Sequence, residues 1–319
     1  MRSSKSTKNI ITQKNQCNMR NKTLLLAAAL LAFASCDKNE TRSSIDQTDP
    51  AERVAVQFTG SALDIAPTPA TRAESPWKQT GKIGVYAIDG TTTDIVDGYA
   101  NVGYAYDGSG NTFTPVGETI YFPVDGSKRR FVAYFPHQDL TGTTYKVDLT
   151  TQPNPDGQAA FELLWTGVTA AYDKKQPNVS LNFNHQYARI MLTVKNGVGI
   201  DTGDLKNMAV DITGMHRLAD FDVLTGTMTP TDNAAPLTLK DYTTDGTGRT
   251  ALVLPTTANA GRTMDFTLGT DTFRWPIGDK EFEAGKSYTY TVTVTRTPLG
   301  LTATVTEWVE GAGDSGVAE

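Results

Sequence analysis

The feature that most constrains the fold is a strict alternation near the C-terminal end, where Tyr288, Tyr290, Val292 and Val294 are separated by single threonines. Successive side chains of a β-strand point to opposite faces, so this spacing puts the apolar residues on one face and the threonines on the other. We expect one face to be buried and the other wet. The chain also contains 28 Gly and 15 Pro, which favours many short strands joined by turns. The sequence therefore predicts an all-β protein with little helix.

A second alternating segment, residues 53–61, is expected to form the first strand of the fold. In it, Val54, Val56 and Phe58 alternate with small or polar residues. The following stretch, residues 62–76, contains three prolines, which cannot donate to a strand ladder, so it should be an exposed loop. The other predicted strands are 82–88, 119–122, 130–135, 143–149, 179–183, 188–195, 207–213, 248–254, 263–268, 287–295 and 301–308.

These strands fall into two blocks separated by a glycine-rich break at residues 196–199. Such a break is typical of a domain boundary, although a loop within one large sandwich would have the same composition. A chain of 319 residues is long enough for two ordinary domains. We predict two antiparallel β-sandwiches in tandem, residues 53–196 and 197–310, followed by a flexible tail at 311–319.

The charge of the chain is unevenly distributed. The formal net charge is −6, but the first 35 residues contain six basic residues and no acidic ones, which leaves 23 basic and 35 acidic residues elsewhere, a net charge of −12. Nucleic-acid binding requires clustered Lys and Arg on phosphate, so this balance argues against a nucleic-acid partner.

The N-terminal 35 residues have the pattern of a signal peptide. Arg20 and Lys22 precede an apolar stretch, residues 24–34, that is too short to span a bilayer. Met19 stands directly before these residues and would open a signal peptide of normal size, so residues 1–18 are interpreted as a start-site artefact.

Small residues come directly before Cys36 and resemble the lipobox of bacterial lipoproteins, with Phe33 where leucine is usual. In this interpretation Cys36 is the first mature residue and carries the lipid, and the polar residues 36–52 form a flexible tether. The alternative is an ordinary signal peptide with a chance cysteine. Cys17 and Cys36 are the two cysteines of the chain, which excludes a disulfide framework.

No pattern in the mature chain indicates catalysis or a cofactor. His137, His185 and His216 lie far apart and lack partners at metal-ligand spacing. Asp220 and Asp222 flank Phe221, and the alternation places both on one solvated strand face rather than in an acid–base pair. We therefore expect no enzyme, no metal and no cofactor.

Several segments in sequence order resemble the fimbrillin family, in particular the Mfa-like proteins of the type V pili of Bacteroidales. The order of these segments, rather than any one of them, carries the resemblance. The sequence departs from the family at Lys82 and Glu162, where aspartate is usual. The matching segments lie at 70–73, 77, 81–86, 119–123, 131–136, 161–165, 181–189, 252–255, 284–290 and 303–308.

The resemblance implies two transthyretin-like β-sandwich domains. In polymerising members, an arginine-specific protease cuts the loop after the first strand, the strand leaves, and the groove accepts a strand from another subunit. Arg72, followed by Ala73, stands where such a cut would occur. Val54, Val56 and Phe58 then mark the pockets that an incoming strand must fill. The alternative is that Arg72 is an ordinary exposed arginine.

Two functions follow from the resemblance and the anchor. The first is a structural or adhesive subunit of a fimbria at the outer membrane surface, with other fimbrial subunits as partners. Its C-terminal tail is too polar and glycine-rich to replace the first strand, which favours a tip or accessory subunit over a stalk, unless residues 301–309 act as the donor. The second is a monomeric surface lipoprotein that binds a glycan or host protein through exposed aromatics such as Tyr99, Tyr104 and Tyr106, although strand or turn packing is the better explanation of these residues.

We expect Cys36→Ala to abolish lipid attachment and outer-membrane retention, because no other residue of the predicted mature chain can carry the anchor. Metabolic labelling with a palmitate analogue measures this directly. Ser43→Ala, in the tether, is the matched control and should keep the label. Persistent label on the Cys36→Ala chain would contradict the lipoprotein interpretation.

Overall fold

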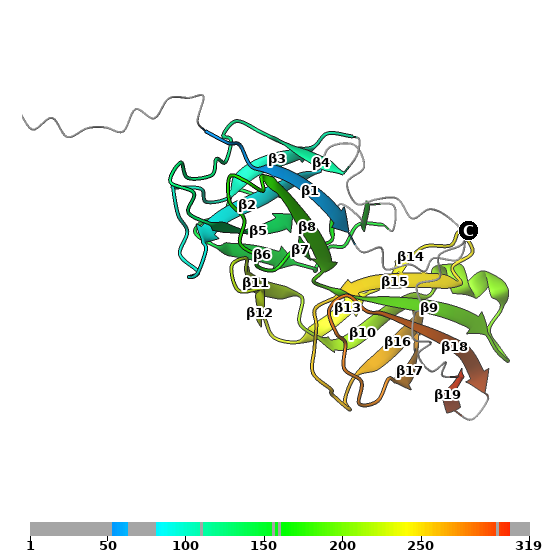
Figure 1. The fold of residues 1–319 in the computed structure, drawn as a ribbon. Coiled ribbons are helices and arrows are strands. Elements are labelled where there is room, and N and C mark those ends of the chain that lie inside the picture. Colours follow the sequence, from blue (N-terminus) through cyan, green and yellow to red (C-terminus); the bar gives the residue numbers. More distant parts are fainter. Residues whose placement is uncertain are drawn as a thin grey trace, which may run out of the picture. The chain divides into compact units, whose positions relative to one another are not determined.

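Nearly every regular element is a β-strand, as predicted (Figure 1). The computed structural model describes residues 53–62, 81–108, 111–154, 157–158, 161–297 and 300–306. A short 3-10 helix, η2 (Thr202–Asn207), interrupts the strands. Within these ranges, no helix is long and apolar enough to cross a bilayer. The strands are β1 (Gln57–Ala62), β2 (Lys82–Asp89), β3 (Val102–Tyr106), β4 (Thr112–Pro115), β5 (Arg129–Phe135), β6 (Thr144–Asp148), β7 (Leu164–Trp165), β8 (Asn178–His185), β9 (Ala188–Asn196), β10 (Ala209–Met215), β11 (Leu218–Asp222), β12 (Thr227–Pro230), β13 (Ala235–Thr238), β14 (Lys240–Asp241), β15 (Gly248–Val253), β16 (Thr263–Leu268), β17 (Asp271–Pro276), β18 (Ser287–Thr297) and β19 (Gly300–Thr306).

Strands from the first part of the chain close into a barrel in the order β1-β4-β3-β2-β5-β7-β8 (Figure 1). Neighbouring strands are antiparallel, except that β1 runs parallel to β8. Aromatic and branched side chains fill the interior, among them Phe58, Phe131 and Phe183. A closed barrel leaves no strand edge unpaired, because each strand is bonded on both sides.

The later strands form two further sheets around a second core. The five-stranded sheet has the order β14-β15-β9-β18-β19, and the four-stranded sheet has the order β13-β10-β16-β17. Strand β9 runs parallel to β18 and antiparallel to β15. The alternation that predicted β18 is confirmed, since Tyr290, Val292 and Val294 are buried.

Strands β2 and β5 are buried on both faces. Phe131 and Ala133 of β5 belong to the barrel interior, whereas Val132 and Tyr134 belong to the second core. This double burial explains why β5 reads as a continuous apolar run instead of an alternation.

A three-stranded sheet, β12-β11-β6, joins strands from the two parts of the chain. Strand β6 comes before β8 in sequence, while β11 and β12 come after β9. Lys146 of β6 reaches both carboxylate oxygens of Asp220 of β11, each at 2.8 Å. The indole N–H of Trp165, in β7, donates to the carbonyl of Val223 just after β11 at 2.6 Å. The later strands therefore pair with β6, which lies between barrel strands β5 and β7 in the sequence, and are bonded to the barrel itself by the side chain of Trp165.

The sheets do not separate at residue 196, where the sequence analysis places the boundary. Strand β9 lies in the five-stranded sheet with later strands, and β6 pairs with β11. The change of sheet falls between His185 and Ala188, where no glycine or proline marks it. The glycine-rich residues 196–199 instead form the turn from β9 to η2.

Most other predicted strands coincide with observed ones. Residues 119–122 are an exception, because they form a single bridge, Tyr121 with Ala55, and no strand. The start of the first strand lies later than predicted, at Gln57. Residues 307–308, the predicted end of the last strand, lie outside the described residues. Several short strands, such as the largely exposed β12, were not predicted because they lack an apolar alternation.

The side chain of Gln152 completes the edge of β15. Strand β14 pairs with β15 at Arg249 and Thr250. Two residues further along, the N–H of Leu252 donates to the Gln152 amide oxygen at 2.7 Å, and the Gln152 amide nitrogen donates to the Leu252 carbonyl at 2.6 Å. Both backbone groups of Leu252 are thus satisfied by one buried side chain.

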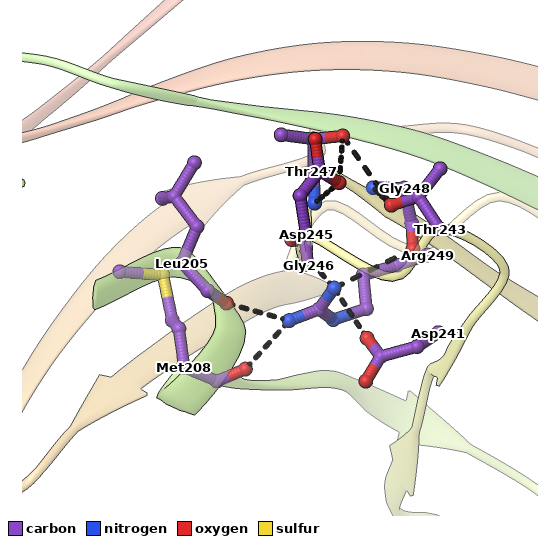
Figure 2. Close-up of polar contacts among 9 residues, drawn as sticks. All are labelled: Leu205, Met208, Asp241, Thr243, Asp245, Gly246, Thr247, Gly248 and Arg249. Atoms are coloured by element: carbon purple, nitrogen blue, oxygen red, sulfur yellow. Dashed lines mark hydrogen bonds and ion pairs between the residues drawn. The ribbon is translucent and has the colours of Figure 1, made fainter. Parts of the chain in front are cut away.

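Arg249, on β15, fixes η2 and the loop before β15 (Figure 2). Its side chain is buried, and its guanidinium donates to the carbonyls of Leu205 (2.8 Å), Met208 (3.0 Å) and Gly246 (2.6 Å). It also forms an ion pair with Asp241 of β14. The guanidinium therefore bonds to the carbonyls at the end of η2, where a positive charge is favourable. Through Asp241 it also binds the edge strand β14.

We expect Arg249→Lys to lower the free energy of unfolding by about 3 kcal/mol, because an ammonium group cannot reach several carbonyls at once and leaves buried acceptors unpaired. Chemical denaturation measures the loss. Arg274→Lys is the matched control, since Arg274 pairs with Asp265 on the surface, and should cost less than about 1 kcal/mol. Equal losses in the two variants would contradict this account of Arg249.

Candidate functional site: the seat of strand β1

Strand β1 lies between β4 and β8 and closes the barrel. It pairs with β4 at two positions, Phe58 with Phe113 and Thr59 with Thr112. Its parallel pairing with β8 is longer and covers Gln57–Ala62. β1 is therefore held mainly by one neighbour, β8.

Backbone hydrogen bonds also hold the residues on either side of this pairing. The N–H of Val56 donates to Ile120 at 2.9 Å, and the Val54 carbonyl accepts from Phe122 at 2.9 Å. On the β4 side, within the strand itself, the N–H of Gly60 donates to the carbonyl of Asn111 at 2.8 Å. If β1 left, these groups and the facing edges of β4 and β8 would lose their partners.

The side chains predicted to fill pockets lie on the inner face, as the alternation required. Val56 and Phe58 are buried, Val54 is half-buried against the same core, and Gln57 between them is exposed. The ring of Phe58 makes edge-to-face contacts with Tyr104 (centroids 4.9 Å apart) and Phe131 (5.2 Å). Phe58 is thus the main apolar anchor of β1.

Gly60 belongs to the same inner face and was missed in the sequence analysis. A Cβ at this position would lie 2.5 Å from Cε2 of Phe113 and 3.2 Å from Cε2 of Phe183. The backbone of β1 therefore approaches these rings more closely than any other residue type permits. The signal was available, because a glycine inside a strand pattern often marks such a close approach.

Polar contacts of the buried Glu162 carboxylate secure the end of β8, the other wall of the site. The carboxylate of Glu162 contacts His185, at the end of β8, and Arg189, in β9. Burial alone would raise the pKa of Glu162, but the bonds from His185 and Arg189 outweigh it and lower that pKa below its ordinary value. The carboxylate is therefore ionised at neutral pH and ties β8 to β9.

The aromatic residues considered as an exposed binding surface lie elsewhere. Tyr99 and Tyr104 are buried and Tyr106 is half-buried, so the expectation of an exposed aromatic surface is wrong for the first two. The hydroxyl of Tyr104 accepts a hydrogen bond from the N–H of Ile120 at 2.9 Å, and burial raises its pKa to about 12. These tyrosines line the barrel around β1.

The other residues considered for catalysis or metal binding do not form a common site among the described residues. Asp220 and Asp222 flank the buried Phe221 on β11, as predicted. Asp220 binds Lys146, and Asp222 accepts from Thr143 at 3.0 Å. Among the described residues, no three His, Cys, Asp or Glu side chains gather as a metal site would require. Cys36, Arg72 and Ala73 lie outside the described residues.

We expect Phe58→Ala to lower the free energy of unfolding by about 3 to 5 kcal/mol, because it removes a fully buried ring and leaves a cavity. Gln57→Ala, on the exposed face of the same strand, should change it by less than about 0.5 kcal/mol. Urea denaturation of both variants checks the difference. Similar stabilities would mean that β1 contributes little to the barrel core.

Comparison with known proteins agrees with this architecture. Residues 71–308 match a family model described as fimbrillin-like. A protein of Bacteroides uniformis named as a fimbrium subunit, Fim1C, is 32% identical over 316 residues, which cover 92% of this chain and 97% of that protein.

Two solved structures are similar. A Bacteroides uniformis protein described as a cell adhesion protein is 30% identical, with a TM-score of 0.64 over 81% of this chain and 100% of that chain. A cell adhesion protein of Bacteroides ovatus, also so described, is 18% identical, with a TM-score of 0.59 over 81% of this chain and 99% of that chain, and supports the fold alone. By its match over most of its length, the chain belongs to the fimbrillin-like family.

Proposed function

We propose that this protein is a structural or adhesive subunit of a fimbria on the cell surface, assembled by strand exchange. In this proposal, cleavage between Arg72 and Ala73 frees β1, and a strand from another subunit takes its place between β4 and β8. The names of its relatives, a fimbrium subunit and a cell adhesion protein, support the fimbrial and adhesive part. They also support a role other than catalysis.

The observation that carries the strand exchange is the position of β1. It is the first strand of the described chain, it is bonded on both sides, and Phe58 within it and Val56 directly before it are buried in the core. Once the chain is cut after it, such a strand can leave together with the residues before it, without threading the rest of the chain. The groove it leaves offers backbone groups and apolar pockets, the two components of β-augmentation.

We further propose the arrangement of the whole chain. Residues 1–35 are the signal peptide, Cys36 carries the lipid at the outer membrane, and residues 36–52 are the tether. Two transthyretin-like β-domains follow, the first of them closed into a barrel instead of the open sandwich expected from the sequence, and the sheets favour a division between β8 and β9 over the sequence-based boundary at 196.

A tip or accessory position is favoured over a stalk position. Residues 300–306, which would form part of a C-terminal donor, are paired with β18 as β19, so donation would require this pairing to break. The alternative function is a monomeric surface lipoprotein that binds a glycan or host protein. The burial of Tyr99 and Tyr104 removes the aromatic surface that would have supported it.

Cleavage at Arg72 tests the proposal. Arg72 is the one arginine between β1 and β2, so an arginine-specific protease can open this segment selectively. We expect cleavage to give a new N-terminus at Ala73 by mass spectrometry. A labelled peptide of residues 53–62 in excess should then exchange into the cut protein, because β1 is no longer tethered.

Uncut protein and protease-treated Arg72→Ala should bind none of this peptide. Equal binding by cut and uncut forms would reject strand exchange. The same conclusion would follow if the cut chain kept residues 53–61 bound under native conditions while the labelled peptide stayed free. Either result would favour the alternative function, a monomeric surface lipoprotein.

A further inference from the structure

The inner face of β1 presents side chains of very different size at successive positions. Val56, Phe58 and Gly60 are all buried, while Gln57 is exposed and Thr59 is half-buried. A replacement strand with the same backbone path must place its own residues at these three positions. The walls of the groove therefore set a size limit at each position.

The position of Phe58 requires a large ring. Tyr104 of β3 and Phe131 of β5 face it edge to face, and Phe122 in turn packs against Phe131 with centroids 6.0 Å apart. These residues are buried and belong to one cluster. A smaller side chain would leave a cavity among rings that cannot all close around it.

The position of Gly60 has the opposite requirement. Phe113 comes from β4 and Phe183 from β8, so the two neighbours of β1 each contribute a ring, with centroids 6.3 Å apart. Both rings are buried, at 3% and 0% exposure, which leaves them little room to move away from a Cβ at 2.5 Å. Overpacking of this kind displaces side chains or backbone and costs affinity.

The backbone path itself is set by β8. Gly60 pairs with Leu181 in the parallel ladder, and its N–H bonds to Asn111. A strand shifted by two residues would bring a side chain against Phe113, and a shift by one would turn its apolar face outward. The side-chain sizes that fit at the Phe58 and Gly60 positions thus also select the register and the direction of the incoming strand.

We propose that the groove selects its donor by a pattern of aliphatic, aromatic and glycine residues at alternate positions, in a strand that runs parallel to β8. The proposal rests on the proposed strand exchange and names the chemistry of the partner. The occupant is a strand of another subunit with a ring at the Phe58 position and glycine at the Gly60 position. Strands that have alternating apolar residues but carry a side chain at the Gly60 position bind weakly.

The test uses protein cut after Arg72 and peptides of residues 53–62. Relative to the unmodified peptide, Gly60→Val should weaken binding about 5- to 150-fold, because it overpacks the two rings. Phe58→Ala should weaken it at least about 100-fold. Gln57→Val adds the same branched side chain on the exposed face and should change affinity less than about threefold.

A matched change in the groove completes the test. In cut Phe113→Ala protein, the Gly60→Val peptide should regain affinity relative to the unmodified peptide, because the ring that excludes its side chain is gone. If Phe113→Ala does not fold, Phe113→Leu removes the nearest ring atoms at smaller cost, and the peptide series on the unmodified groove still decides.

The failures of the two proposals are distinguishable. If the unmodified peptide binds and Gly60→Val binds equally well, the glycine requirement is overturned while strand exchange stands. If no peptide binds the cut protein, strand exchange itself is rejected, and the donor pattern falls with it.

Discussion

The structure depends on the closure of the barrel by β1. A barrel avoids free edges only while every strand is in place, and β1 supplies the backbone partners of both β4 and β8. The same strand fills the interior through Val56 and Phe58. The first strand of the described chain thus contributes both backbone hydrogen bonds and core packing to the barrel. With this strand in place the barrel is closed, and without it the barrel would have an open groove.

The second core is built largely without this strand. Val56 and Phe58 belong to the barrel core, whereas the second core draws on β9, β10, β16 and β18 and contains none of the β1 residues whose side chains the structure describes, 57–60. Strands β2 and β5 contribute to both cores, and the β12-β11-β6 sheet binds the barrel to the later strands. The walls around β1 therefore have support of their own.

The alternation of Val54, Val56 and Phe58 was sufficient to predict the first strand and its buried face, because that information lies in neighbouring residues. The sheet change between His185 and Ala188 was not predictable, since the link between the two strands, Gln186 and Tyr187, carries no turn residue. Gly60 and Arg249 depend on partners far along the chain, Phe113 and Phe183 for one and the end of η2 for the other. Their roles follow from contacts that local sequence does not encode.

The side-chain amide of Gln152 has a consequence for unintended pairing of β15 with strands of other chains. A sheet edge with unpaired backbone groups can pair with a strand of another chain wherever it is left uncovered. Without Gln152, the backbone N–H and C=O of Leu252 would be open to hydrogen bonds from another strand. The Gln152 amide already bonds to both groups. A single side-chain amide thus covers this stretch of the β15 edge, which a second chain could otherwise pair with.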